Sequence, residues 1–476
     1  MAIAEQPDGE GGRHLQATVV PAERALQTMR RSVQERRLDE WRMIYGSVYE
    51  AQPDSQEFGE NFSEWTSSYD RQPIARAEME EWRAGTVDTI LGMRPRRVLE
   101  IGAGSGLILS RVAPRCESYW ATDLSRDAVD ILARAVGRNP QLGGVVELRN
   151  QPAHDFTGLP SGYFDTVVLN SVIQYFPDAD YLADVIKGAL AALAPGGFVL
   201  LGDVRNRRLR RSLYAAAELY RSDPGATAAS VERAMEQQLL KERELFLDPE
   251  FFTGLPARVE DISLVDVRLR RGIHHNELTR YRYDVLIGRG PARPLPLDNA
   301  VRPVWGAEIG DIAELENFLT QENPAVLRLN GIPNARVRNE TGASRALEEG
   351  ASMSSVMEIL RDICAPGSGL DPEECHKLGK RLGYAVRTTW SAGSADGDFD
   401  VAFALPSRVP ADTHFSLSPS TAGPGSSPGQ SISVLDSEST AIFAASLQAY
   451  LAKMFQNIPL PQTTFVITEE LPDDRG

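Results

Sequence analysis

The sequence predicts an α/β protein with a doubly wound, mostly parallel sheet, followed by a smaller α+β region. Two observations predict the sheet. A short apolar strand at 98–101 leads into a turn with three glycines and then into a helix, and strands alternate regularly with helices from residue 97 to residue 202. Two later strands, 261–270 and 281–287, are expected to close the sheet as an antiparallel pair.

Length and composition limit the class of protein. A chain of 476 residues is too long for one core, so we expect two or three domains. Fifty basic and 66 acidic residues give a net charge of −16, which argues against nucleic acid or an anionic membrane as a partner. The three cysteines lack metal-ligand spacing and no apolar run reaches 18 residues, so we expect a cytoplasmic chain that does not enter a membrane.

The glycine turn indicates which cofactor is bound. Glu100 begins the pattern E-x-G-x-G-x-G, in which Gly102, Gly104 and Gly106 allow a sharp turn and close approach to a ligand. A dinucleotide site uses G-x-G-x-x-G to bind a pyrophosphate, which the Glu100 carboxylate would repel. S-adenosylmethionine has a sulfonium cation and no phosphate, so it suits this turn. Asp123 ends the next strand, where its carboxylate can accept the ribose hydroxyls.

The elements before and within the sheet follow from periodicity and turn residues. The N-terminal part is interpreted as a lid, with a strand that stands alone at 14–21, a helix at 22–49, a polar and aromatic segment at 62–70 and a helix at 75–91. The sheet region is predicted to have strands at 98–101, 119–122, 145–149, 164–169 and 198–202 and helices at 108–112, 126–137 and 179–194. The helical segment 205–247 is interpreted as another lid or an acceptor-side insertion.

A proline-rich break at 291–296 separates the second region. Its predicted helices are at 312–320, 351–364 and 373–382, and its strands are at 325–329, 385–390 and 400–404. The Ser/Gly/Pro-rich segment 419–433 is expected to be flexible, and it precedes a helix at 441–454 and a strand at 463–468.

Four strings beyond the glycine turn carry a family resemblance. They are Trp65–Asp70, Leu169–Phe176, Gly202–Arg205 and His274–Asp284. Together with the glycine turn they resemble the class I methyltransferase domains embedded in the adenylation domains of nonribosomal peptide synthetases. The likeness covers residues 10–290 and continues more weakly to Asp400. It implies an S-adenosylmethionine-dependent enzyme that releases S-adenosylhomocysteine, in a family most of whose members N-methylate a carrier-bound aminoacyl amine.

The resemblance also implies domain boundaries. We expect an N-terminal strand and helical lid at 1–95, a methyltransferase core at 96–290, an accessory α+β domain at 300–405, a linker at 406–440 and an adenylation-like remnant at 441–476. The remnant lacks the Asn-Gly-Lys turn of adenylation domains, and no AMP-binding core is found. The chain is therefore expected not to activate an amino acid itself, and it is interpreted as a methyltransferase excised from a synthetase or evolved to stand alone.

Several assignments at the strand ends follow from the resemblance. Glu100 is assigned to the methionine end of the cofactor or to the glycine turn, and His154 and Asp155 to the adenine. His154 departs from the acidic pair common in the family. Asn170 is assigned to the amino group of the cofactor and Gln174 to the acceptor side.

Aromatic and charged residues supply the remaining assignments. Tyr69 and Tyr175 are placed around the sulfonium and acceptor, with core packing as the alternative. Asp203 and Arg205 follow the fifth strand, either as substrate contacts or as a structural ion pair.

The stretch His274–Glu277 contains two imidazoles, an amide and a carboxylate. We expect no metal there, because the stretch is a loop without an H-E-x-x-H helix or a distant cysteine pair. His275 and Glu277 are candidates for the catalytic base or for orienting the acceptor, and Tyr69 and Gln174 are also assigned to catalysis. His274 and Asn276 are assigned to binding the acceptor. A purely structural loop is the alternative.

The leading hypothesis is methylation of the amine of an amino acid or peptidyl intermediate, free or tethered to a carrier protein. An O-methyltransferase acting on a hydroxyl or carboxylate is a second hypothesis. A non-catalytic module that docks to a synthetase or a small adaptor protein is the third.

Overall fold

The structure is a computed structural model that describes residues 2–7, 13–19, 23–50, 58–361, 369–410, 413–419 and 463–467. The chain divides into two compact units, Met1–Trp41 with Ser427–Gly476, and Arg42–Ser426. The helix expected at 441–454 and nearly all of the segment 419–433 lie outside the described residues.

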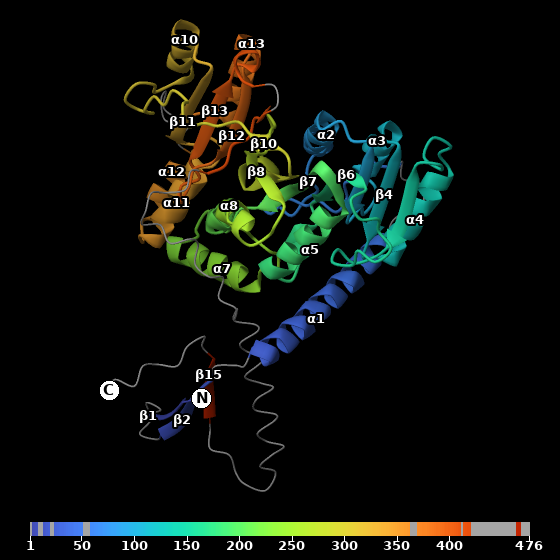
Figure 1. Cartoon of the computed structure of the whole chain (residues 1–476). Helices are drawn as coiled ribbons and strands as arrows, with labels where there is room; N and C mark the ends of the chain where they lie inside the picture. The colour runs from blue at the N-terminus through green and yellow to red at the C-terminus, as the bar shows by residue number, and fades with distance from the viewer. Residues whose placement is uncertain are drawn as a thin grey trace. The chain divides into compact units, whose positions relative to one another are not determined.

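The smaller unit contains a three-stranded sheet made from both ends of the chain (Figure 1). Its strands are β1 (Ala2–Pro7), β2 (Arg13–Val19) and β15 (Thr463–Ile467). β2 pairs antiparallel with β1 and parallel with β15. The expectation that the first predicted strand stands alone is therefore wrong, because its partners lie in β1, which was not predicted, and over 440 residues later.

A seven-stranded sheet forms the centre of the larger unit (Figure 1). In spatial order its strands are β5 (Val146–Asn150), β4 (Ser118–Asp123), β3 (Arg97–Ile101), β6 (Phe164–Asn170), β7 (Leu193–Arg205), β9 (Arg282–Arg289) and β8 (Ile262–Leu269). The first five are parallel, whereas β9 is antiparallel to β7 and β8. The predicted doubly wound sheet with a C-terminal antiparallel pair is confirmed.

The strand order determines where a ligand can bind. From β3 the chain adds strands on one side through β4 and β5, and then on the other side through β6 and β7. Ligands of doubly wound sheets bind outside the carboxyl ends of the strands at this reversal. The carboxyl ends of β3, β4 and β6 are therefore the expected place for the cofactor.

Three helices pack against the sheet through one hydrophobic cluster. They are α2 (Arg76–Gly92), α3 (Leu109–Val112) and α4 (Arg126–Gly137). Ile90, Leu109 and Leu132 from these helices are fully buried in the cluster together with Val98 and Tyr119 of the sheet. The helices lie where the apolar periodicity predicts them, because it is this apolar face that they bury.

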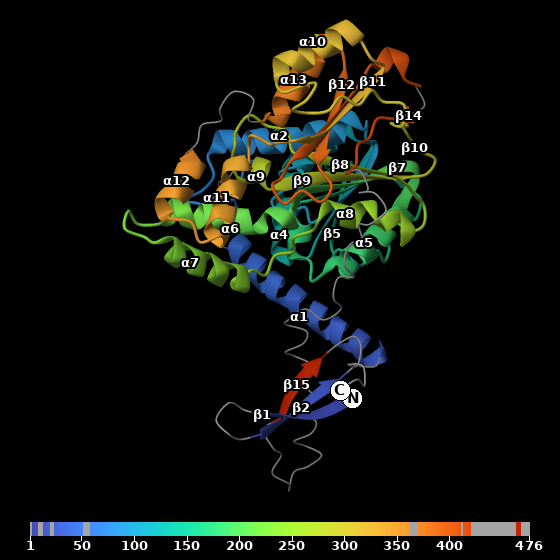
Figure 2. The same ribbon diagram turned by 90° about the vertical axis from the view of Figure 1, so that its left-hand side faces the viewer.

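The other helices of the larger unit flank the sheet or form the insertion after β7 (Figure 2). They include α5 (Ala179–Ala192), α6 (Arg210–Arg221), α7 (Ala228–Lys241), α8 (Pro249–Thr253) and the short α9 (Glu277–Arg280). The long helix α1 (Glu23–Glu50) also agrees with its prediction.

The differences from the predictions include the boundary between α5 and β7 and the helix α11 (Arg338–Glu348). β7 begins at Leu193, before the Pro195-Gly-Gly turn, so α5 ends at Ala192 rather than at 194. α11 was not predicted, since glycine, serine and threonine weaken its helical pattern. It forms because Ala343 and Leu347 are buried against α6 and the helix α12 (Met353–Arg361).

The expected accessory α+β region is present (Figures 1 and 2). Besides α11 and α12 it contains α10 (Ile312–Glu322), α13 (Pro372–Leu382), and a three-stranded antiparallel sheet in the order β11 (Val326–Ile332), β13 (Phe399–Ala404) and β12 (Ala385–Trp390). A further parallel pair joins β10 (Arg293–Pro294) to β14 (Thr413–His414). The accessory region packs on the core through β8 and α6.

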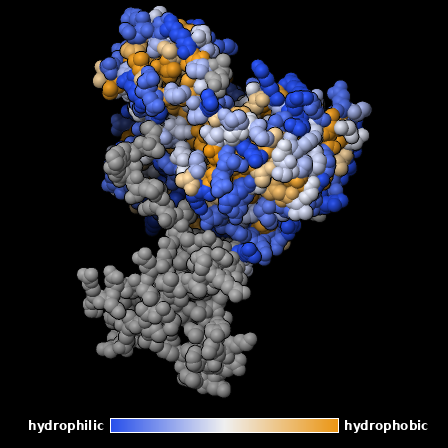
Figure 3. Space-filling view, in the orientation of Figure 1, coloured by the Kyte–Doolittle hydropathy of each residue, from blue (hydrophilic) through white to orange (hydrophobic). Residues whose placement is uncertain are grey.

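The face of the described residues seen in Figure 3 is mainly hydrophilic, with patches of hydrophobic residues, one of them over the accessory region. Exposed apolar side chains include Tyr220 at 64% and Leu240 at 85%. Within the described part of the chain, no helix has both the length and the apolar character needed to cross a membrane.

Candidate active site

The glycine turn after β3 has a backbone shape that only glycine adopts readily. Gly102, Gly104 and Gly106 have φ values of +78°, +51° and +82°. A Cβ atom at Gly102 would lie 2.5 Å from Val172 Cγ2, and one at Gly106 would lie 2.7 Å from Leu132 Cδ2. The turn therefore has no room for side chains at these two positions, because neighbouring side chains pack directly against its backbone.

Asp123, at the end of β4, is bonded to this turn. Gly104 N–H donates to Asp123 Oδ2 at 2.9 Å, and Ser125 N–H donates to Asp123 Oδ1 at 2.8 Å. Burial raises the pKa of Asp123, while these two hydrogen bonds act in the opposite direction. A carboxylate has about four acceptor positions, so both oxygens keep capacity for ligand hydroxyls.

Glu100 lies beneath the turn rather than at its surface. Its side chain is buried, and Tyr119 O–H donates to Glu100 Oε2 at 2.7 Å. Burial raises the pKa of Glu100 to about 8, with the nearby Asp123 adding to the effect. Of the two roles proposed from the sequence, this position favours support of the glycine turn.

The raised pKa of Glu100 predicts a pH-dependent cost in stability. The folded state keeps a proton that the unfolded state releases at pH 4.5, so stability falls as the pH rises from about 4.5 to 8. Glu100→Gln should remove this cost while still accepting from Tyr119. Between pH 5 and pH 8 we expect the variant to gain at least about 1.4 kcal/mol over the wild type.

Urea unfolding at both pH values measures this difference. Glu117→Gln is the control, because its carboxylate is 56% exposed and paired with Arg96 at the surface. A stability difference between Glu100→Gln and the wild type that stays constant with pH would contradict the raised pKa.

The end of β6 presents two buried amide oxygens that have no donor among the described residues. They are Asn170 Oδ1 and Gln174 Oε1, in side chains that are 8% and 3% exposed. Gln174 is oriented by its Nε2–H, which donates to the Ser171 carbonyl at 3.0 Å. Buried acceptors without donors are rare in folded proteins, so these two oxygens are expected to bind ligand N–H or O–H groups.

The residues at these strand ends fit S-adenosylmethionine. Asn170 would accept from the amino group of its methionine end, Asp123 would accept from the ribose, and the glycine turn allows close approach of the backbone. When bound, this cofactor supplies an electrophilic methyl group on a sulfonium.

His154 and Asp155 follow β5 on the adenine side of the predicted site. His154 Nδ1 lies 2.8 Å from the Tyr181 hydroxyl, and the two rings pack edge to face. Asp155 Oδ1 accepts from Thr157 N–H at 2.8 Å, and hydrogen bonding with Thr157 lowers the pKa of Asp155. Both side chains are thus engaged within their own region, and their contact with adenine stays a prediction.

Asp203 is the centre of a buried ionic network at the end of β7. Its side chain is fully buried and accepts hydrogen bonds from the Ser171 hydroxyl and from Trp82 Nε1–H, the latter at 3.2 Å. Two guanidinium groups also lie close to the carboxylate, with nitrogen–oxygen distances of 2.5 Å for Arg282 and 3.7 Å for Arg270. Burial alone would raise the pKa of Asp203, but Arg282 and Arg270 hold it below its usual value. The geometry favours the structural alternative over direct substrate contact.

Arg205, the last residue of β7, holds the segment that follows α7. Its Nε lies 2.6 Å from Glu244 Oε2, and its guanidinium lies 5.2 Å from the centre of the Phe246 ring. The same segment is hydrogen-bonded to the short helix after β6, because Leu245 N–H donates to the Gln174 carbonyl at 2.7 Å. Arg205 thus has a structural partner, and its contact with the acceptor stays a prediction.

The loop His274–Glu277 is tied to α2 by two of its residues. His274 Nδ1 lies 2.8 Å from Glu81 Oε2, and Asn276 Nδ2–H donates to Glu78 Oε2 at 2.7 Å. Asn276 also caps α9, because its Oδ1 accepts from Leu278 N–H. These contacts orient the loop rather than face a ligand.

His275 contacts the accessory region. Its Nε2 lies 2.9 Å from Asp371 Oδ2, and Asp371 is the N-cap of α13. Burial acts to raise the pKa of Asp371, but His275 and Arg336 lower it to about 2. The structure does not bring His275 together with Gln174, so its assignment as a base has no support from this geometry.

Glu277 is buried and holds the segment before α2. Its Oε2 accepts from Ser68 N–H at 2.6 Å and its Oε1 from the Ser68 hydroxyl at 3.0 Å, with Arg282 at 3.8 Å. The Ser68 carbonyl in turn accepts from Arg221 of α6. Glu277 therefore joins the lid segment to the sheet.

Tyr69 follows Ser68 and contacts two other tyrosines. Its hydroxyl lies 3.0 Å from the Tyr281 hydroxyl, and its ring packs edge to face on Tyr220 at 5.9 Å. Burial raises the pKa of Tyr69, which keeps its hydroxyl neutral. Tyr175 is half-buried in the short helix after β6.

Replacing Glu277 with glutamine tests its role. The amide NH2 would have to donate to the Ser68 hydroxyl, which now donates to the carboxylate, and the attraction to Arg282 would be lost, so the lid segment should be held less firmly. We expect turnover to fall about tenfold, with the dissociation constant of S-adenosylmethionine changed less than about twofold. Initial rates and calorimetry measure the two effects, with Glu80→Gln, an exposed residue on α2, as the control. Unchanged turnover would remove Glu277 from the active site.

Sequence reasoning missed the partners that organise these residues. Ser68 and Arg282 lie inside the strings that carried the resemblance, yet neither was assigned a role. No motif or spacing in the sequence pointed to Trp82, Arg270 or Asp371 as partners of the assigned residues. Within the described residues, no group of three or more histidine, cysteine or acidic side chains is arranged to hold a metal ion.

Comparison with known proteins shows a methyltransferase domain and a group of relatives. Residues 99–199 match the methyltransferase domain family. A probable non-canonical nonribosomal peptide synthetase, CymA of Salinispora arenicola, is 41% identical over 338 residues, which are 70% of this chain and 4% of that protein. Chondramide synthase cmdD of Chondromyces crocatus is 34% identical over 85% of this chain and 10% of its own length.

Enniatin synthase of Fusarium equiseti is 31% identical over 73% of this chain and 12% of its own length. The chain thus spans at most about an eighth of these three relatives. The matched part of the chain includes the glycine turn, Asp123 and Asn170. The chain thus contains an S-adenosylmethionine-dependent methyltransferase domain and is homologous to segments of nonribosomal peptide synthetases.

Proposed function

We propose that this methyltransferase methylates the amine nitrogen of an amino acid, or of an aminoacyl or peptidyl intermediate in natural-product biosynthesis. The observation that carries the proposal is the pair of buried amide oxygens at the end of β6, Asn170 Oδ1 and Gln174 Oε1. With Asn170 assigned to the amino group of the cofactor, Gln174 remains as an acceptor for the N–H of the incoming amine.

The relatives support the substrate class. The similarity to peptide synthetases covers 70% to 85% of the chain, far more than residues 99–199 of the methyltransferase domain. The similarity therefore extends well beyond the methyltransferase domain itself. An acceptor carried on a synthetase or on a separate carrier protein is part of this proposal.

For methyl transfer to an amine, the main task of the protein is to position the two reacting groups. A free α-amine has a pKa near 8, so a neutral fraction with a free electron pair is available at neutral pH. Gln174 Oε1 would accept one N–H and direct the electron pair of the nitrogen toward the methyl carbon. A C–N bond would form as the C–S bond of the sulfonium breaks, and the methylated nitrogen would release its extra proton to solvent. Alignment of the two groups can supply most of the acceleration.

Mass spectrometry with S-adenosylmethionine tests the proposal. Matched panels of free and carrier-tethered amino acids, hydroxy acids and short peptides would be offered to the full chain. A gain of one methyl on an amine supports the proposal, and the more reactive panel shows whether tethering is required. Methylation of the hydroxy acids alone would overturn it in favour of the O-methyltransferase alternative, and cofactor binding with no turnover on any acceptor would favour a docking module.

A further inference from the structure

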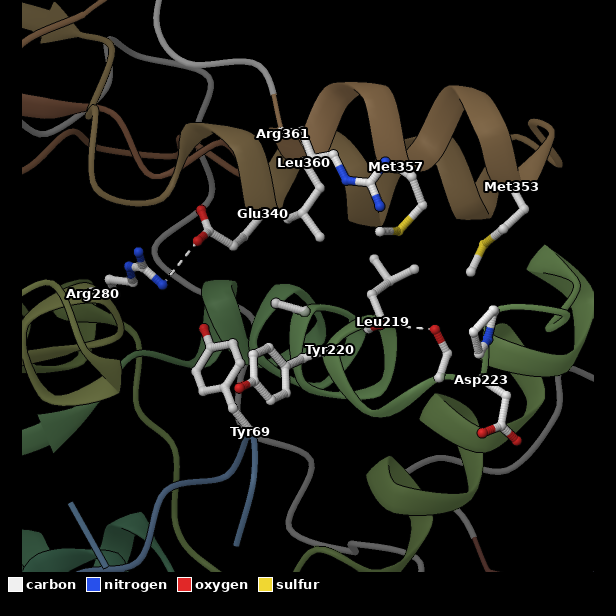
Figure 4. Close-up of a pocket in the computed structure, with 13 residues that line it drawn as sticks. Tyr69, Leu219, Tyr220, Asp223, Arg280, Glu340, Met353, Met357, Leu360 and Arg361 are labelled. Carbon is white, nitrogen blue, oxygen red and sulfur yellow. Dashed lines mark hydrogen bonds and ion pairs between the residues drawn. The ribbon is translucent and has the colours of Figure 1, made fainter. Parts of the chain in front are cut away.

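A cavity of about 580 Å³ lies between the insertion after β7 and the accessory region (Figure 4). Leu219 and Tyr220 of α6 form one wall, and Met353, Met357 and Leu360 of α12 form the opposite wall. Its volume is within the range of small-molecule sites, about 300–1,000 Å³. The cavity is therefore large enough for an aminoacyl unit.

One end of the cavity is polar. Arg280 at the end of α9 pairs with Glu340 of α11 at 3.0 Å, and Tyr69 lies beside them (Figure 4). The Glu340 side chain is only 10% exposed, and Arg280 Nε is buried without a hydrogen-bond partner among the described residues. This end offers donors and acceptors to amide or carbonyl groups.

The charges in the cavity lining balance. Arg280 and Arg361 are cationic, and Asp223 and Glu340 are anionic. Such a lining has no strong preference for an ion of either sign. The apolar walls and the polar end together suit a neutral ligand that has an apolar side chain and amide or ester groups.

The polar end is connected to the methyl-transfer site. Tyr69 follows Ser68, which is bonded to Glu277 at the start of α9, and Arg280 ends that same helix. Arg282, two residues later, binds Asp203, which accepts from Ser171 next to Asn170. The cavity and the end of β6 are thus parts of one hydrogen-bonded assembly.

We propose that this cavity binds the apolar side chain of the acceptor aminoacyl unit and thereby selects acceptors by side-chain size. The side chain packs between α6 and α12, and the amide or ester part faces Arg280 and Tyr69. Met353 and Met357 are flexible and polarizable, so the walls adapt to more than one apolar shape. This inference rests on the proposed function, since it names the acceptor as an aminoacyl unit.

Substitutions at Met357 test the cavity, because this half-buried side chain lies on its wall. The substrates are N-acetylcysteamine thioesters of alanine, leucine and phenylalanine. For the wild type we expect kcat/KM to be at least about tenfold higher for leucyl than for alanyl thioester. Met357→Trp, which fills the cavity, should lower the leucyl value about tenfold and change the alanyl value less than about twofold.

A second variant and a control complete the kinetic test. Met357→Ala enlarges the cavity and should raise the kcat/KM of the phenylalanyl thioester relative to the leucyl one. If Met357→Trp does not fold, the result for Met357→Ala tests the proposal instead. Leu240→Trp is the control, because Leu240 is 85% exposed on α7 and outside the cavity. Equal effects of the Met357 variants on all three substrates, or no effect on any, would overturn the proposal.

Calorimetry separates this proposal from the proposed function. Leucinamide and alaninamide are titrated into the full chain saturated with S-adenosylhomocysteine, where no turnover occurs. Tighter binding of leucinamide, lost in Met357→Trp, supports the cavity even if no thioester is methylated, an outcome that would overturn only the proposed function. Equal affinity for the two amides in the wild type would overturn the cavity as a side-chain site.

Discussion

Replacing Asp123 with alanine is expected to weaken the binding of S-adenosylmethionine at least about 100-fold. The carboxylate holds the glycine turn through Gly104 N–H and keeps free acceptor positions for the ribose. A hydrogen bond to a charged group contributes about 1.5–3 kcal/mol, and a tenfold change in affinity corresponds to about 1.4 kcal/mol. Loss of two such contacts therefore reaches the stated effect.

Calorimetric titration of the folded variant measures the change. Asp130→Ala is the matched control, since Asp130 is an exposed carboxylate on α4 that pairs only with Arg126 in the contacts described. Gly104→Val should have an equally large effect, because valine is strained at a φ of +51°. Unchanged affinity in Asp123→Ala would mean that the ribose binds elsewhere.

The core of this protein could be predicted because its signals are local. The apolar run at 98–101, the three glycines and Asp123 lie within about 25 residues of one another, so their spacing alone predicts a strand, a turn and a ligand-facing carboxylate. Parallel strands then bring Asn170 to the same edge. These assignments need no knowledge of distant contacts.

The contacts of the loop His274–Glu277 could not be predicted from the sequence. Its residue types suggest acid–base chemistry, but their partners are Glu81, Asp371 and Ser68, between 96 and 209 residues away in the sequence. No periodicity or spacing reports contacts of that range. The first strand has the same limitation, since its parallel partner, β15, comes from the other end of the chain.

Substitution of Arg336 is expected to have a large effect on the stability of the protein rather than on cofactor binding. Its guanidinium is fully buried and makes three bonds, to Asp371 Oδ1 at 2.7 Å and to the carbonyls of Arg270 and Gly272 at 2.8 and 2.9 Å. The two carbonyls belong to the end of β8 and the start of the loop that leads to Glu277. Arg336 thus joins the accessory region to the segment that follows β8 and leads to Glu277.

Arg336→Met is expected to lower the free energy of unfolding by about 3–5 kcal/mol, because it leaves two buried carbonyls without donors and Asp371 without its guanidinium partner. Urea unfolding measures the change. The control is Arg381→Met in the same region. Arg381 pairs with Glu316 through side chains that are 56% and 40% exposed, so its loss should cost at most about 1 kcal/mol.

The same variant decides what the accessory region does for catalysis. If the region supports the loop that holds Ser68 and Tyr69, Arg336→Met should lower turnover at temperatures where the protein is still folded, and the affinity for S-adenosylmethionine should stay within about twofold of the wild type. Equal losses of stability in Arg336→Met and Arg381→Met would contradict the buried network. A destabilised variant with unchanged turnover would mean that the accessory region contributes stability alone.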